Sequence, residues 1–159
     1  MASSPDKLDK TDLKILRILQ ENGRITNLSL SQEIGLSPAP TLERVKKLEN
    51  AGIIQSYHAV VDDSKVGLQI QAFIQVSLTR QVNNAIVNFK KQIHQIPEVM
   101  ECYQVTGNAD YVLKVIVPDI SAFEELISEK LSSMEEIGSM QTTVILSETK
   151  LSRTLPLKY

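Results

Sequence analysis

Residues 37–47 read Ser37-Pro38-Ala39-Pro40-Thr41-Leu42-Glu43-Arg44-Val45-Lys46-Lys47. Ser37 is a favourable N-cap, and both prolines fall in the first turn of a helix, where the missing amides would have no partner. Apolar residues then recur on one side at Leu42, Val45 and Leu48. The stretch therefore predicts a helix that begins at Ser37 and packs this apolar side against other helices.

Two helices are expected before this one. Asp9 can cap the first and Gly23 can end it, and its apolar stripe consists of Leu13, Ile15, Leu16 and Leu19. Thr26 can cap a second, shorter helix that ends at Gly35. Two helices followed by a tight turn and a third helix are typical of a helix-turn-helix domain.

The polar side of the third helix has the chemistry of a DNA reader. Small residues at its N-terminal end allow close approach to a major groove, where Arg44 could reach base edges and Lys46 and Lys47 could reach phosphates. The alternative is the solvated face of an amphipathic helix, but the three-helix context favours DNA. The residues expected at the DNA interface are Thr26, Asn27, Ser37, Pro38, Ala39, Pro40, Glu43, Arg44, Lys46 and Lys47.

The second half of the chain alternates apolar and polar residues with a period of two. The expected strands lie at 68–79, 100–106, 111–117 and 139–146, and the expected helices lie at 83–95 and after Asp119. This βαββαβ order predicts a ferredoxin-like sandwich with two helices on one face of the sheet. The other face is bare in a monomer and carries Phe73, so we expect dimerisation through the sheet.

The fold class is therefore α+β, with an N-terminal winged helix-turn-helix domain and a C-terminal αβ-sandwich. Residues 53–61 have strand composition and are expected to form a wing or a linker strand. The predicted divisions are a DNA-binding domain at 1–62, a linker at 63–68, an effector-binding and oligomerisation domain at 69–150, and a C-terminal tail at 151–159.

Composition excludes several other classes of protein. The chain has 159 residues with 42% apolar residues, but no apolar run approaches the 20 or so residues that span a membrane. It lacks glycine-rich nucleotide loops, and neither His58 nor His94 forms a metal-spaced pair or neighbours Cys102, which is expected to be buried in a strand. We therefore expect no catalytic site, no metal and no membrane partner, in a cytoplasmic protein without a secretory signal.

The charge distribution bears on how DNA could be bound. The formal net charge is −2, and residues 1–62 contain eight Lys or Arg residues against eight acidic ones. A neutral reader domain binds DNA weakly on its own, so several copies acting together are expected.

One loop in the second half could hold a small ligand. In Thr106-Gly107-Asn108-Ala109-Asp110, the glycine permits close backbone approach, the amides can meet a carboxylate, and Asp110 can pair with an ammonium group. The equally weighted alternative is an ordinary hairpin turn in which Asp110 accepts hydrogen bonds from backbone amides.

Motifs from both halves together resemble one family. The first half contains Leu8-Asp9-x-x-Asp12-x-x-Ile15-Leu16, Asn22-Gly23-Arg24 and Leu36-Ser37-Pro38-x-Pro40-x-Leu42-Glu43-Arg44-Val45-Lys46-Lys47-Leu48-Glu49-x-x-Gly52-Ile53-Ile54. The second half contains Thr106-Gly107-x-x-Asp110-Tyr111 and Val117-Pro118-Asp119. Over residues 8–150 the chain resembles the Lrp/AsnC, or feast/famine, transcription regulators of bacteria and archaea, and within them the leucine-responsive branch.

The resemblance implies a helix-turn-helix domain that binds double-stranded DNA and a sandwich domain that senses an amino acid, leucine or another. It also implies dimers that assemble into octamers, no cofactor, and a nucleoid-associated location. By motif, and by the stretch before the last strand, the effector would bind at Thr106, Gly107, Asn108, Asp110, Gly138, Ser139 and Met140. Met140 departs from the small polar residue expected there, and Ser29 replaces a Glu that would complete a capping box with Thr26.

The sequence thus predicts a non-enzymatic transcription regulator whose assembly or DNA affinity responds to an amino acid. The alternative is an amino-acid-sensing accessory subunit that uses its helical domain to dock on a protein. An enzyme of the acylphosphatase kind would need a glycine-rich phosphate loop with an Arg, which the second half lacks.

Overall fold

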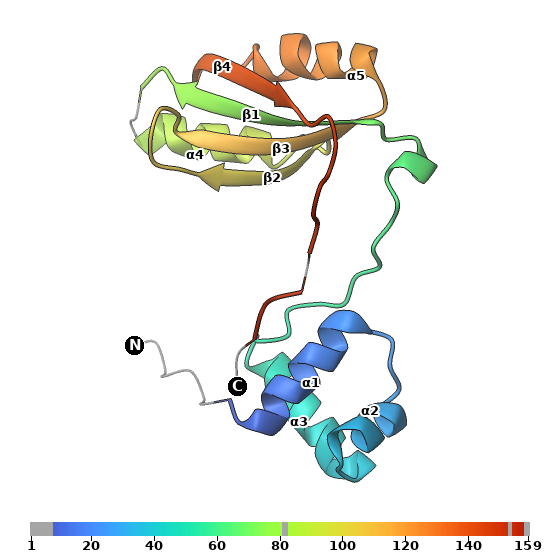
Figure 1. Ribbon diagram of the computed structural model, residues 1–159. Helices are drawn as coiled ribbons and strands as arrows, with labels where there is room; N and C mark the ends of the chain where they lie inside the picture. The colour runs from blue at the N-terminus through green and yellow to red at the C-terminus, as the bar shows by residue number, and fades with distance from the viewer. Residues whose placement is uncertain (1–7, 81–82, 153, 158–159) are drawn as a thin grey trace. The chain divides into compact units, whose positions relative to one another are not determined.

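The computed structural model describes residues 8–80, 83–152 and 154–157. The chain divides into two compact units, one made of residues 1–60 with 150–159 and one made of residues 61–149 (Figure 1). The first division lies close to the expected limit at residue 62. The described residues of the expected C-terminal tail, 151–152 and 154–157, group with the helical unit.

The helical unit consists of α1 (Lys10–Glu21), α2 (Asn27–Ile34) and α3 (Pro38–Asn50). Asp9 caps α1 in a reciprocal capping box with Asp12, and Gly35 ends α2 with a positive φ of 74°. The apolar stripes meet in one core, whose buried members are Ile15, Leu16, Leu30 and Leu48. The expected helix-turn-helix arrangement is confirmed.

The C-terminal segment completes this core. Leu157 packs against the cluster of the three helices, and the Leu155 amide donates a 2.6 Å hydrogen bond to Gln20 Oε1. No local pattern in the sequence indicates this contact, because its partners are 135 residues apart.

Two details of α3 differ from the sequence-based expectation. Ser37 occupies the N-cap position, but its side chain makes no cap hydrogen bond, because Pro40 at the third helical position has no amide to donate. Thr41, rather than Leu42, faces the core: Thr41 is fully buried and Leu42 is 41% exposed. Thr41 can be buried because its hydroxyl donates a 2.9 Å hydrogen bond to the Ser37 carbonyl.

The strand expected at 53–61 does not form. These residues take no regular secondary structure, although their composition favours a strand. A strand requires a partner for its backbone groups, and the only sheet among the described residues lies in the second unit. The segment leads into a short 3₁₀ turn, η1 (Ser64–Val66), that Gly67 ends.

The second unit is a four-stranded antiparallel sheet covered by two helical segments. Its elements are β1 (Ile70–Leu78), α4 (Asn83–Ile93), β2 (Val99–Gln104), β3 (Tyr111–Val117), α5 (Ile120–Glu125) continued by the π-helical turn η2 (Leu126–Leu131), and β4 (Ile137–Val144). The strand order β2-β3-β1-β4 makes β1 and β3 central. The predicted βαββαβ sandwich is confirmed (Figure 1).

The core lies between the sheet and its helices. Alternate residues of β1 and β3 are buried against Phe89 of α4 and against Leu126 and Leu131 of η2. Asp119 caps α5 as expected, since its Oδ1 accepts a 2.9 Å hydrogen bond from the Ala122 amide. The opposite sheet face has no helix, and Phe73 there is 39% exposed beside Lys114 on the neighbouring strand.

Cys102 is exposed, which corrects the expectation of a buried strand cysteine. The reason is its place in the sheet: β2 is an edge strand, and every residue from Met100 to Gln104 is exposed.

Candidate nucleic-acid interface and ligand site

The outward side of α3 is an exposed surface with two lysines and one glutamate. Pro38, Ala39 and Pro40 are exposed, and they are followed on the outward side by Glu43, Lys46 and Lys47, which are also exposed. Small side chains at the helix start leave the backbone accessible, and the two lysines offer cations to phosphates. This arrangement can enter a major groove.

Two residues expected to contact DNA make hydrogen bonds at the start of α2, and one of them, Asn27, ties it to α3. Asn27 Nδ2 donates a 2.8 Å hydrogen bond to the Pro38 carbonyl, which ties the start of α2 to the start of α3. Thr26 caps α2: its Oγ1 accepts from the Ser29 amide at 3.1 Å and donates to Ser29 Oγ at 2.9 Å. Their hydrogen bonds therefore position the outward face of α3.

Arg44 is engaged inside the helical unit. Its Nη1 donates to Asp9 Oδ2 at 2.8 Å and to Asp12 Oδ1 at 2.7 Å, so one guanidinium joins α3 to both acids of the α1 capping box. The carboxylates raise the pKa of Arg44, and the pKa of Asp9 is lowered chiefly by the Asp12 amide and next by Arg44. This placement differs from the expected contact with base edges.

A signal for the Arg44 contact is present in the sequence. Arg44 precedes Leu48 by four residues, which places both on the same side of the helix. Since Leu48 is a core residue, Arg44 faces α1 at the border of the core.

The hairpin between β2 and β3 has a defined backbone. Gly107 has a φ of 115°, which side-chain-bearing residues rarely adopt. Asp110 ties the hairpin to β1: its Oδ2 accepts a 2.8 Å hydrogen bond from the Leu78 amide, and its own amide donates to the Val76 carbonyl at 2.9 Å. The backbone-binding role of Asp110 is thus present in the structure.

The second segment expected to bind the ligand, residues 138–140, also lies beside the end of β1. Ser139 pairs with Ser77 and Met140 with Val76 on the neighbouring strand. Gly138 lies against the end of β1 so closely that a Cβ there would stand 3.2 Å from the Thr79 nitrogen. Both segments therefore border the C-terminal end of β1, the hairpin from the side of β3 and residues 138–140 from the side of β4.

A small hollow of about 130 Å³ beside the end of β1 includes Asp110 among its lining residues, whereas Gly138, Ser139 and Met140 do not line it. Thr106, Gly107 and Asn108 are exposed on the hairpin and do not line it. Sequence reasoning missed Leu78 and Ile86, which supply apolar walls of the hollow. Ile86 precedes the core residue Phe89 by three positions, so its place on the inner side of α4 was readable from helical periodicity.

In the part of the chain that the structure describes, no group of His, Cys, Asp and Glu residues is placed to hold a metal ion. No helix among the described residues is both long enough and apolar enough to cross a bilayer.

Two known families match successive parts of the chain. Residues 8–55 match a winged helix-turn-helix DNA-binding family, and residues 71–155 match the Lrp/AsnC ligand binding domain.

Similar proteins match over almost the full chain. The leucine-responsive regulatory protein of Escherichia coli (strain K12) is 38% identical, over 95% of this chain and 92% of that protein. A transcriptional regulator from Neisseria meningitidis, solved as a complex with L-Met, is 42% identical with a TM-score of 0.90, over 94% of this chain and 96% of its own. An AsnC family transcriptional regulator from Agrobacterium tumefaciens is 31% identical with a TM-score of 0.88, over 94% and 97% of the two chains.

The fold and these matches define a transcription regulator that joins a DNA-binding helix-turn-helix domain to a ligand-binding domain, and not an enzyme. They favour DNA binding over the alternative of a protein-docking module. The chain belongs to the Lrp/AsnC family.

Proposed function

We propose that this protein binds double-stranded DNA as a homo-oligomer through α3, and that an amino acid bound near the end of β1 changes its assembly or its DNA affinity. The observation that carries the proposal is that hairpin 106–110 and segment 138–140 both border the end of β1.

On the DNA side, the proposed contact surface is the outward face of α3. Lys46 and Lys47 bind phosphates, and Pro38, Ala39, Pro40 and Glu43 lie in the groove, while Thr26, Asn27, Ser37 and Arg44 hold this face in position. A two-fold dimer presents two such helices to half-sites about 34 Å apart or a multiple of that.

Assembly into oligomers supplies the DNA affinity that a single helix-turn-helix domain lacks. Residues 1–62 carry equal numbers of basic and acidic side chains, so we propose that dimers formed through the bare sheet face assemble further into octamers. Light scattering on the full chain, with and without DNA, tests this; a species that stays monomeric while binding DNA tightly contradicts it. We also propose that the protein is cytoplasmic and associated with the nucleoid.

On the effector side, we propose an amino acid with an apolar side chain, leucine or another such as methionine. The Neisseria meningitidis regulator complexed with L-Met supports the amino-acid class. The hairpin amides would bind the carboxylate, Asp110 would pair with the ammonium group, and Gly138, Ser139 and Met140 would form a further wall.

The test separates the charge of Asp110 from its backbone role. Asp110→Asn keeps an oxygen that can accept from the Leu78 amide but removes the negative charge. We expect the full-length variant to bind operator DNA like the unmodified protein in gel-shift assays, but to lose its response to the amino acid. Glu148→Gln, an exposed change of the same kind, is the matched control. An undiminished response in Asp110→Asn overturns the assignment.

A further inference from the structure

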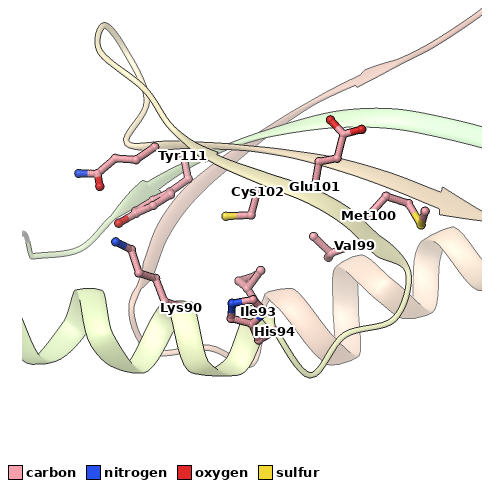
Figure 2. Close-up of a pocket in the computed structure, with 9 residues that line it drawn as sticks. Lys90, Ile93, His94, Val99, Met100, Glu101, Cys102 and Tyr111 are labelled. Carbon is pink, nitrogen blue, oxygen red and sulfur yellow. The ribbon is translucent and has the colours of Figure 1, made fainter. Parts of the chain in front are cut away.

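A second cavity lies on the helix side of the sheet, between α4 and the edge strand β2 (Figure 2). Its volume is about 320 Å³, within the range of small-molecule sites. None of the residues proposed above to bind the effector lines it, and the lining residues that it shares with the hollow beside Asp110 are Gln104 and Tyr111. Ile93 and Val99 give it an apolar wall, and Lys90, Cys102 and Tyr111 give it a polar end.

Tyr111 supplies an unused donor at this polar end. Its side chain is 2% exposed, yet its hydroxyl has no hydrogen-bond partner among the described residues. Burying such a group without a partner is unfavourable, so a ligand oxygen that reached it from the cavity would be favoured. Figure 2 shows this hydroxyl directed toward the Lys90 ammonium group at the same end of the cavity.

Lys90 supplies the charge. Its Nζ lies 6.0 Å from the centre of the Tyr111 ring, and it forms no ion pair with a described residue. Burial raises the pKa of Tyr111, so its hydroxyl stays protonated and able to donate at neutral pH. Partial desolvation also raises the pKa of the Cys102 thiol, and the charge of Lys90 opposes this rise only in part. The thiol therefore stays uncharged at neutral pH.

The nearby acid does not cancel this charge. Glu101 Oε2 accepts a 2.6 Å hydrogen bond from the Tyr103 hydroxyl, and Figure 2 shows the Glu101 carboxylate directed away from α4. The polar end of the cavity therefore combines a cation and a neutral donor, which is the chemistry that binds a carboxylate. It lacks an acid directed inward to pair with the ammonium group of an amino acid.

We propose that this cavity is a second ligand site, which binds a small aliphatic monocarboxylate without an amino group. The carboxylate lies between Lys90 Nζ and the Tyr111 hydroxyl, and the aliphatic body packs against Ile93 and Val99.

The test is a ligand-observed NMR titration of the full-length protein with 4-methylpentanoate. Two comparison probes separate charge from apolar body: 4-methylpentan-1-ol has the same body without charge, and acetate has the charge without the body. We expect 4-methylpentanoate to bind at least about tenfold more tightly than either, because a hydrogen-bonded charge and buried CH₂ groups each contribute more than 1 kcal/mol.

Three variants and one control locate the binding. Lys90→Met and Tyr111→Phe should each weaken the binding of 4-methylpentanoate by about tenfold. Tyr111→Phe keeps the ring that packs on Phe89 at 4.7 Å between centroids, so the fold is retained. Lys91→Met changes the next residue of α4, which is exposed and does not line the cavity, and should have no effect. Asp110→Asn should also leave this binding unchanged, which separates the cavity from the proposed effector site.

Three outcomes would overturn the proposal. These are no binding of 4-methylpentanoate to the unmodified protein, equal binding of the alcohol and the carboxylate, or unchanged affinity in both Lys90→Met and Tyr111→Phe.

Discussion

The substitution Arg44→Met distinguishes two roles for Arg44: contact with DNA bases and stabilisation of the helical unit. As a base contact, Arg44 would matter for DNA affinity and little for stability. In the structure its guanidinium instead joins Asp9 and Asp12 at distances of 2.8 and 2.7 Å. Arg44→Met keeps most of the aliphatic stem and removes both ion pairs.

The expected loss of stability follows from the exposure of the partners. The Asp12 side chain is 15% exposed, so its charged hydrogen bond to Arg44 is sheltered from water and contributes about 1 kcal/mol. The Asp9 side chain is 50% exposed, so solvent screening limits the contribution of its ion pair with Arg44 to about 0.5 kcal/mol. We expect Arg44→Met to destabilise the helical unit by about 1–2 kcal/mol.

Hydrogen exchange measured by mass spectrometry on the full-length chain reports this unit separately from the sheet. A loss of this size should speed exchange in peptides from α1 and α3 by about 5- to 30-fold and leave β1 and β3 unchanged. Lys46→Met, an exposed change on the outward face of α3, should weaken DNA binding without altering exchange.

Acid should reduce the difference in stability between Arg44→Met and the unmodified protein. The folded-state pKa of Asp9 lies below the ordinary value of 3.8, chiefly through the Asp12 amide and then through Arg44. A depressed carboxyl pKa contributes stability above the unfolded-state pKa, and the contribution is lost as the pH falls through the folded-state pKa. The difference in stability between the two proteins should therefore be largest at neutral pH and become smaller as the pH falls through the folded-state pKa of Asp9. Unchanged exchange in α1 at neutral pH, together with lost DNA selectivity, would refute the structural role and support a base contact.

Two further predictions concern the hairpin and the C-terminal segment. Gly107→Ala should destabilise the hairpin by about 1–3 kcal/mol, because alanine is strained at a φ of 115°, and faster exchange in peptides spanning residues 104–111 measures it. An unaffected hairpin would contradict the strain. Leu157→Ala should destabilise the helical unit by about 1 kcal/mol in the same assay, since Leu157 packs on its core, whereas Leu151→Ala, at an exposed position, should not. Equal effects of the two leucine changes would argue against a specific contact.

Much of the fold was predictable because its determinants are local. The capping acids Asp9 and Asp119, the two prolines of α3 and the alternation along β1 act between residues only a few positions apart. The strand expected at 53–61 failed for the opposite reason, since composition favours an extended chain but cannot supply a pairing partner.

For the candidate sites, the sequence named the hairpin and the outward face of α3 but not how each is held. Gly107 and the motif ending in Asp110 pointed to the hairpin, and two roles for Asp110 remained open. The hydrogen bond from the Leu78 amide to Asp110 crosses 32 positions, so only the folded chain could reveal it.

By itself, the sequence determined the helix-turn-helix and sandwich architecture and the family, because caps, periodicity and motifs are properties of neighbouring residues. The tertiary structure decided three further points: Arg44 binds the cap of α1, Leu157 packs on the first core, and the Tyr111 hydroxyl near Lys90 has no hydrogen-bond partner in the described part of the chain. Each depends on which side chains meet across elements and how much water they exclude, and these quantities exist only once the chain has packed.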